Sequence, residues 1–229
     1  MHFFNPAEPI FRSKQSELDY QDQVGLIKMQ WRLGERTIFS RFYTRIDQIF
    51  VLWGVITGAI FGVAQFCPIS WTIQAWLWST LTGLGILGMV ILAWFWASVE
   101  RLRWVICTWA GLMTLGLVCT NLGILGGWWS ILLYLCPLWL GLSALGYLLT
   151  AIGMHSRAFL VACGLHLFSI PLLPYTGRWQ LLVTGLVMAG SLLFLSEVQW
   201  DMRPPVEFAE LTPAQRQHNQ HQHQLRQLA

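Results

Sequence analysis

Six long apolar runs constrain the fold of this chain more than any other feature of its sequence. They lie at 48–67, 73–97, 104–126, 129–153, 158–173 and 179–197. A helix that crosses the hydrocarbon core of a bilayer needs about 20 mainly apolar residues, and only the run at 158–173 is clearly shorter than that. Because the runs also lack the polar alternation of membrane-barrel strands, they predict an all-α integral membrane protein with a six-helix transmembrane bundle.

The charge content indicates the same fold class. Only 11% of the residues are charged, whereas a typical soluble domain has about 25%. This composition argues against a soluble enzyme, a disordered chain and a nucleic-acid-binding module, so no nucleic-acid partner is expected. The chain has 12 Arg, two Lys and 14 Trp, a composition typical of bacterial proteins. We therefore expect the protein to lie in a bacterial plasma membrane or a thylakoid membrane.

The positions of the basic residues predict the orientation of the chain. Lys and Arg collect in the short cytoplasmic loops of membrane proteins. Thirteen of the 14 lie before the first run, after the last run, or in the loops after the second and fourth runs, and only Arg178 lies in the other loops. Both termini are therefore predicted to be cytoplasmic. The predicted parts are an N-terminal segment at 1–47, a transmembrane domain at 48–198 and a polar tail at 199–229.

The N-terminal segment is predicted to form an amphipathic helix on the cytoplasmic side. Val24, Ile27, Trp31, Ile38 and Phe42 recur at helical spacings. Five bases accompany this stripe, namely Lys28, Arg32, Arg36, Arg41 and Arg45. A basic amphipathic helix binds an anionic membrane surface; docking against the chain's own loops and docking to a partner are the two other interpretations.

The C-terminal tail is predicted to contain a short polar helix at 213–227. Thr212 and Pro213 are a suitable N-cap and first-turn pair. The helix is rich in Gln and His and has little apolar surface to bury, so it is expected to be mobile.

Small residues predict the packing surfaces of two of the helices. Gly54, Gly58 and Gly62 are spaced by four in the first run and would form a flat groove that another helix can approach closely. Gly185 and Ala189 offer a matching smooth face in the last run. Packing within the bundle is the expected use of these faces, and a homodimer or another membrane subunit is the alternative.

His166 is the one ionisable side chain near the middle of an apolar run. A polar group at that depth is a candidate functional residue, and a neutral imidazole could ligate the metal of a haem or a chlorophyll-type pigment. A hydrogen-bonded structural histidine and a substrate or proton site are the other interpretations. Gln65, Gln74 and Asn121 lie toward the outer ends of the runs, and with His166 they are the candidates for a polar cavity.

Signatures of catalysis and of metal binding are missing from the sequence. It contains no HExxH, no GxSxG, no paired-aspartate motif and no Walker loop. The five cysteines have no metal-ligand spacing and are interpreted as free thiols, so no metal site is expected. The charges at the cytoplasmic ends of the runs are interpreted as orientation charges or loop ion pairs; they are Glu100, Arg101, Arg103, Arg157 and Glu197.

These features favour a non-enzymatic function. The leading hypothesis is an accessory, assembly or scaffold subunit of a larger membrane complex, which would bind the lipid bilayer and other membrane subunits. The first alternative is a permease or facilitator for a small neutral or lipidic solute. The second is a haem- or pigment-binding membrane protein that uses His166.

Overall fold

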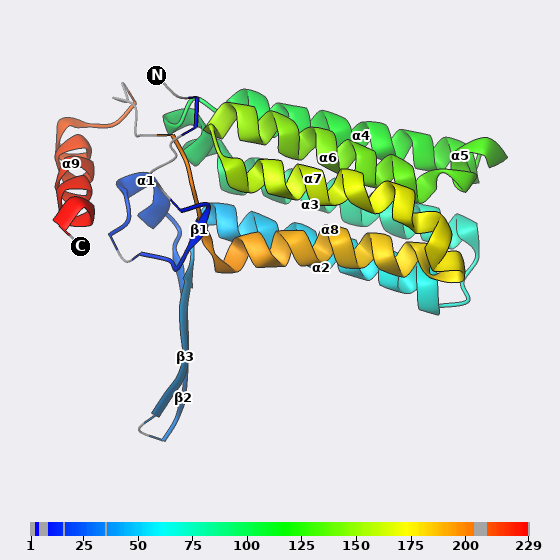
Figure 1. Cartoon of the computed structure of the whole chain (residues 1–229), viewed down its shortest axis with the longest axis horizontal. Helices are drawn as coiled ribbons and strands as arrows, with labels where there is room; N and C mark the ends of the chain where they lie inside the picture. Colours follow the sequence, from blue (N-terminus) through cyan, green and yellow to red (C-terminus); the bar gives the residue numbers. More distant parts are fainter. Residues whose placement is uncertain (1–2, 5–8, 16, 35, 204–209, 229) are drawn as a thin grey trace.

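Apolar helices that run side by side make up most of the chain (Figure 1). The computed structural model describes residues 3–4, 9–15, 17–34, 36–203 and 210–228. The bundle helices are α2 (Arg45–Phe66), α3 (Trp71–Val99), α4 (Arg103–Ile124), α6 (Leu135–Met154), α7 (Arg157–Leu172) and α8 (Gln180–Glu197). The short helix α5 (Trp129–Leu133) precedes α6, and the 3₁₀ helix η1 (Leu173–Trp179) joins α7 to α8.

The apolar runs correspond closely to these helices. Five of the six predicted runs end within three residues of the observed helix bounds, and the run at 129–153 is divided between α5 and α6. Among the residues that the structure describes, five helical stretches are long and apolar enough to cross a membrane. The last of these, Arg157–Glu197, contains α7, η1 and α8. Gly177 in η1 has a φ of +55°, which side chains disfavour. The chain turns back between α7 and α8 (Figure 1).

The described parts of both chain ends lie at one end of the bundle (Figure 1). This is the end at which α2, α4 and α7 begin, and it is called the polar end below. Among the helices, α2 packs on α3 and α8, α4 packs on α3 and α6, and α7 packs on α6. The loop between α2 and α3, the helix α5 and η1 lie at the opposite end (Figure 1).

Glycine recurs where an aromatic side chain of a neighbouring helix comes close. A Cβ built on each of these glycines would lie less than 3.0 Å from the aromatic residue, closer than real Cβ atoms come. The pairs are Gly85 with Trp53, Gly116 with Trp139, Gly146 with Trp109, Gly153 with Trp104 and Gly185 with Phe61. Tryptophan rings thus fill four of these notches and the Phe61 Cβ lies closest to the fifth, at Gly185, and the dense contact adds dispersion attraction between helices.

A hydrogen bond fixes one of these rings between α4 and α6. The Trp109 indole Nε1 of α4 donates to Thr150 Oγ1 of α6 at 2.9 Å, and that hydroxyl donates to the Gly146 carbonyl at 2.8 Å. The indole N–H is therefore paired although the ring lies inside the bundle, where an unpaired donor would be costly.

The same contact occurs a second time with the roles of the two helices exchanged. Trp139 Nε1 of α6 donates to Thr120 Oγ1 of α4 at 3.2 Å, and that hydroxyl donates to the Gly116 carbonyl at 2.7 Å. Both helices carry the pattern Trp-x₆-Gly-x₃-Thr, at 109–120 and at 139–150. Because α4 and α6 are antiparallel (Figure 1), each tryptophan meets the glycine and threonine of the other helix.

The predicted glycine face of α2 lies next to α8 over part of its length. A Cβ at Gly54 would lie 2.9 Å from the Leu193 side chain and 3.5 Å from the Ala189 carbonyl oxygen. A Cβ at Gly58 would make an ordinary contact with the Ala189 Cβ at 3.8 Å, and a Cβ at Gly62 would have nothing within 4 Å among the described residues. Of the three glycines, Gly54 is therefore the one at which α8 comes close to α2, and it lies in the half of α2 nearer the polar end.

The predicted N-terminal amphipathic helix is wrong, and the all-α fold class needs the same correction. This segment forms the strand β1 (Phe11–Arg12), the one-turn helix α1 (Tyr20–Gln23) and a hairpin of β2 (Ile27–Leu33) and β3 (Arg36–Tyr43). Apolar residues in β2 alternate strictly with polar ones, a period of two that favours a strand. Glycine at position 34, with a φ of +62°, lies at the turn.

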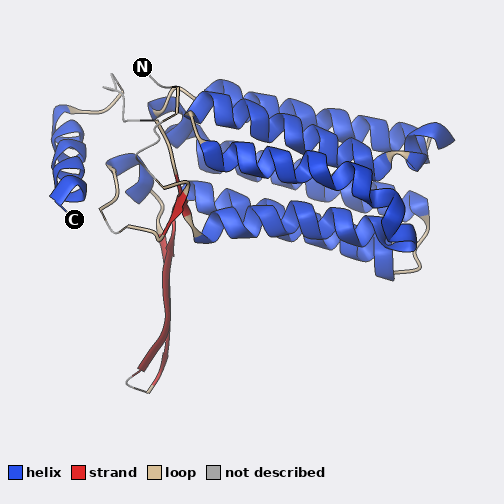
Figure 2. Ribbon diagram, viewed as in Figure 1, coloured by secondary structure: helices blue, strands red, loops and turns tan. Residues whose placement is uncertain are grey.

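The β2–β3 hairpin extends sideways from the polar end, away from the helices (Figures 1 and 2). Its strands are antiparallel, with Ile27 opposite Tyr43, Met29 opposite Arg41 and Leu33 opposite Arg36. The first strand, β1, instead pairs with β4 (Gln199–Trp200) just after α8. The N-terminal segment is thereby attached to the polar end at β1, while the hairpin projects from it.

The predicted C-terminal helix is present as α9 (Pro213–Leu228). The backbone N–H of Gln215 donates to Thr212 Oγ1 at 3.4 Å, and the backbone N–H of Thr212 donates to Gln215 Oε1 at 2.9 Å, as in a capping box. This helix was expected to have little apolar surface to bury; among its described residues a polar one, Asn219, is buried against α1.

We expect the change Gly146→Ala to destabilise the bundle by about 1–3 kcal/mol, as overpacking does. The new Cβ would lie 2.6 Å from the Trp109 ring, and the hydrogen bond to Thr150 hinders that ring from moving away. Gly141→Ala on the same helix is the control, because nothing lies within 4 Å of that position among the described residues. It should keep or raise the melting temperature in detergent, since alanine favours helices. Equal melting temperatures for the two variants would contradict the prediction.

Candidate functional site

An apolar cavity of about 90 Å³ lies between the helices of the bundle. Helices α2, α3, α4, α6, α7 and α8 all contribute to its wall. Most lining side chains are aliphatic, aromatic or methionine, and polar atoms are few. His166 of α7 is the ionisable imidazole among them, and Tyr147 of α6 lies beside it with a ring-centroid distance of 5.0 Å.

His166 is completely buried, and only one of its two ring nitrogens has a protein partner. Nδ1 lies 2.9 Å from the Ala162 carbonyl oxygen, one helical turn earlier. Nε2 has no hydrogen-bond partner among the described residues, although it is shielded from solvent. The cavity is therefore an apolar space next to one unpaired imidazole nitrogen.

The structure does not bring the other predicted polar residues to this cavity. Gln65, Gln74 and Asn121 lie near the opposite end of the bundle and are absent from the cavity wall. Each amide bonds to a local group: Gln65 Nε2 to the Arg178 carbonyl (3.3 Å), Gln74 Nε2 to the Ile69 carbonyl (3.3 Å) and Asn121 Nδ2 to Ser79 Oγ (3.0 Å). They secure loops and helix pairs at that end, separately from His166.

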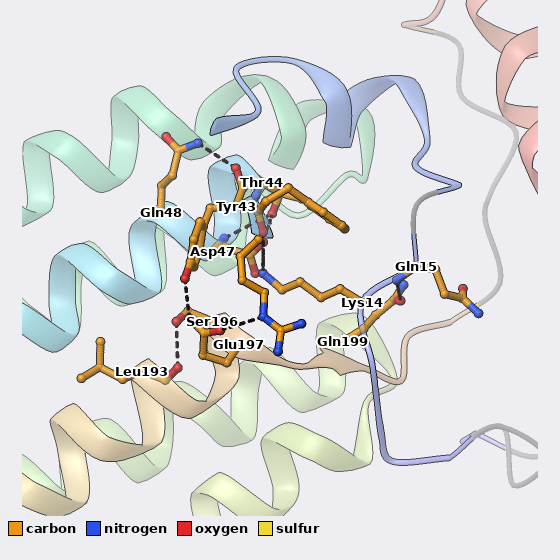
Figure 3. Close-up of polar contacts among 12 residues, drawn as sticks. Lys14, Gln15, Tyr43, Thr44, Asp47, Gln48, Leu193, Ser196, Glu197 and Gln199 are labelled. Carbon is orange, nitrogen blue, oxygen red and sulfur yellow. Dashed lines mark hydrogen bonds and ion pairs between the residues drawn. The ribbon is translucent and has the colours of Figure 1, made fainter. Parts of the chain in front are cut away.

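A buried ion pair attaches the N-terminal segment to the bundle at the polar end (Figure 3). Lys14 Nζ lies 2.8 Å from Asp47 Oδ2, and both side chains are more than 90% buried. The same carboxylate accepts from the Thr44 amide at 2.8 Å and from its hydroxyl at 3.0 Å, which caps the start of α2. Lys14 also donates to the Phe42 carbonyl at 3.1 Å. One ammonium group thus joins the N-terminal segment, the hairpin and α2.

Further polar contacts hold the base of the hairpin against α8 and α2 (Figure 3). The Tyr43 hydroxyl donates to Glu197 Oε1 at 2.6 Å, and Gln48 Nε2 donates to the Gly25 carbonyl at 2.8 Å. Burial, together with the hydrogen bond to Glu197, raises the pKa of Tyr43 to about 12. The phenol therefore stays protonated and keeps donating over the physiological pH range.

A series of hydrogen bonds between buried side chains connects α9, α1 and the end of α3. Asn219 Nδ2 donates to Gln21 Oε1 at 3.0 Å, and Gln21 Nε2 donates to Glu100 Oε1 at 3.0 Å. The Tyr20 amide donates to Asn219 Oδ1 at 2.7 Å. Burial raises the pKa of Glu100 to about 7, although the Gln21 hydrogen bond and the Arg203 charge oppose the rise. This carboxyl group, interpreted from the sequence as an orientation charge, is a buried link between three segments.

Asp201, which lies beyond the last run, caps the start of α7 from another part of the chain. Its carboxylate accepts from Ser156 Oγ (3.0 Å), from the Arg157 amide (3.0 Å) and Nε (2.8 Å), and from the Ala158 amide (3.0 Å). Burial favours the neutral acid, but these donors outweigh it and lower the pKa of Asp201. A carboxylate at a helix N-terminus also suits the helix dipole.

The five predicted docking bases fall on the hairpin and at its base. Lys28 and Arg41 are exposed on the strands, and Arg41 Nε lies 3.9 Å from Glu197 Oε2. Arg45 begins α2, and its side chain lies against Gly25. The side chains of Arg32 and Arg36 lie outside the part of the chain that the structure describes. Lys28 and Arg41 are therefore the bases that the structure shows to be accessible.

Metal-ligating side chains do not converge in the described part of the chain. No three His, Cys, Asp or Glu residues among the described ones are placed to hold a metal ion. Comparison of the chain with protein-family models, with curated proteins and with solved structures finds no match.

The raised pKa of Glu100 predicts a pH dependence of stability. A carboxyl group with a folded-state pKa of about 7 against an ordinary 4.5 binds protons more readily in the folded state. Its contribution to stability is fully present below about pH 4.5 and is lost as pH rises through about 7. The melting temperature should therefore fall between pH 5 and pH 8, and Glu100→Gln should flatten that slope. Glu197→Gln, at an exposed ion pair, should keep the parent slope; a parent slope in Glu100→Gln would contradict the prediction.

Proposed function

We propose that the chain is a multi-pass membrane protein without catalytic activity, and that it serves as an accessory or assembly subunit that docks a partner protein through the β2–β3 hairpin. The hairpin is the observation that carries this proposal, because it projects from the bundle and leaves apolar side chains uncovered.

The outer surface of the bundle supports insertion into a bilayer. Large apolar side chains such as Val55, Leu87, Ile91, Leu186 and Phe168 are exposed along the helices, which water disfavours and lipid tails accept. We assign six crossings, one for each of α2, α3, α4, α6, α7 and α8. The polar end carries most of the basic residues and is therefore assigned to the cytoplasmic side.

The hairpin lacks the cover that a two-stranded sheet normally needs. A two-stranded hairpin alone is marginally stable in water. Ile27 and Met29 of β2 are 48% and 44% exposed, and the strands contact each other far more than they contact the bundle. Exposed Ile27 and Met29, with the base Arg41 opposite Met29 on the same face of the hairpin, suit an acidic partner surface with an apolar centre. A partner lying beside the bundle would complete the structure of this segment.

The geometry gives less support to the two alternatives. A permease needs polar groups along one path, whereas Gln65, Gln74 and Asn121 lie away from His166. The cavity has a volume of about 90 Å³. Pockets that bind drug-sized ligands measure roughly 300–1,000 Å³, so the cavity is too small for a haem or a pigment. Neither alternative uses the hairpin.

Cysteine labelling tests the assigned orientation. Cys67 is exposed in the loop between α2 and α3, so a membrane-impermeant thiol reagent should label it in intact cells. In a background in which all five cysteines are replaced by serine, Ser13→Cys and Ala214→Cys place single thiols at exposed positions near each terminus, and they should react only after permeabilisation. An odd number of crossings would place the two thiols on opposite sides of the membrane.

A charge placed on either face of β2 tests the docking function. Met29→Asp should put a carboxylate into the apolar contact and shift the protein to a lower mass in native gels of mildly solubilised host membranes. Gln30→Asp adds the same charge at the neighbouring exposed position, which points to the opposite face of the strand, and should leave the complex intact. Both variants should melt as the parent does, since neither side chain is buried in the bundle.

The outcomes decide the proposal directly. If the parent and both variants migrate at the mass of the single chain, the hairpin docks no protein. If Met29→Asp instead loses binding to anionic vesicles while the complex persists, the hairpin is a lipid-binding element and the docking proposal is overturned.

A further inference from the structure

We propose that the His166 cavity is a binding site for a small apolar molecule that carries one O–H or N–H donor, of the size of a phenol or a short alcohol. The site lies within the bundle and is independent of partner docking by the hairpin.

The contact with Ala162 determines the tautomer of His166. A backbone carbonyl oxygen can only accept, so the nitrogen that lies 2.9 Å from it must donate. Nδ1 therefore carries the hydrogen, and in a neutral imidazole Nε2 is left with a lone pair and no hydrogen. The cavity thus presents an acceptor, and the complementary group on a ligand is a donor.

A ligand that carries a donor would pair this buried acceptor. His166 has no exposed surface, and its Nε2 has no partner among the described residues. An unpaired acceptor in an apolar interior is unfavourable, so a hydrogen bond from a ligand would stabilise this nitrogen. Water is a poor occupant, since a buried water needs two to four polar partners and this cavity is lined mainly by apolar atoms.

The volume and the lining limit the size of the ligand. A cavity of about 90 Å³ compares with the engineered apolar cavity of about 150 Å³ that binds benzene. Four methionines line the space, namely Met89, Met113, Met154 and Met188. Their unbranched side chains adapt to the shape of a ligand, so a molecule with one ring fits once they repack.

The cavity approaches the polar end, which gives the site a connection to the N-terminal segment. Ile46, Trp96 and Leu102 belong to its wall and lie where α2 begins, α3 ends and α4 begins. Trp96 Nε1 donates to Asp22 Oδ1 of α1 at 2.8 Å. Trp96, a residue of the His166 cavity wall, is thus held in place by α1 at the polar end.

Phenol and toluene are matched probes for this site, because they differ in an O–H against a methyl group. We expect phenol to raise the melting temperature of the purified full chain by about 2–4 °C more than toluene at equal concentration, the effect of one net hydrogen bond in a chain of this size. In His166→Leu the two probes should act equally. His221→Leu, at an exposed histidine of α9, should keep the parent difference.

A second measurement keeps the test decisive if His166→Leu fails to fold. In the parent protein, phenol should change the ¹⁵N chemical shift of His166 Nε2 toward that of a hydrogen-bonded nitrogen, and toluene should not. Equal stabilisation of the parent by phenol and toluene, with no change at Nε2, would overturn the proposal. A haem or pigment absorption band that co-purifies with the parent and disappears in His166→Leu would also overturn it, since Nε2 would then be a metal ligand.

Discussion

Helices in this bundle approach one another where glycine makes room for an aromatic ring, and the rest of the structure depends on that packing. Where lipid surrounds a bundle, burial of apolar surface drives helices together weakly, so dense contact must do so. Trp109 and Trp139 fill such notches, and their N–H groups are paired by threonine hydroxyls. Trp109 and Trp53 also line the His166 cavity. The rings that join the helices therefore also bound the space between them.

Helix positions could be predicted from the sequence because length and apolar content alone identify them. The N-terminal segment could not be predicted in the same way. Its apolar residues fit a helical stripe over 24–46, yet 27–33 also alternates with a period of two, and the β-branched and aromatic residues of 36–43 favour strands. The pattern Trp-x₆-Gly-x₃-Thr was visible at 109–120 and 139–150 and would have identified α4 and α6 as a pair.

One residue of the candidate site could be predicted from the sequence, and the buried polar contacts at the polar end could not. His166 stood out because an imidazole in an apolar run is rare, and it does lie at the cavity. The buried roles of Glu100 and Asp201 could not be foreseen, because the partners of each come from segments about 40 to 100 residues away. A charge near a helix end looks the same in sequence whether it orients a helix or links three segments. The difference arises only when the chain termini fold back over the polar end.

The pairing of the two chain ends has a consequence for the order in which the molecule is completed. The partners of Phe11 and Tyr20 are Trp200 and Asn219, residues that a ribosome adds only after all the bundle helices between them. The segment around Phe11 and Tyr20 therefore stays without these partners until the six helices from α2 to α8 have been synthesised. Closure of the polar end reports that translation has passed Asn219, and a chain truncated before that residue would leave Tyr20 and Gln21 without this contact.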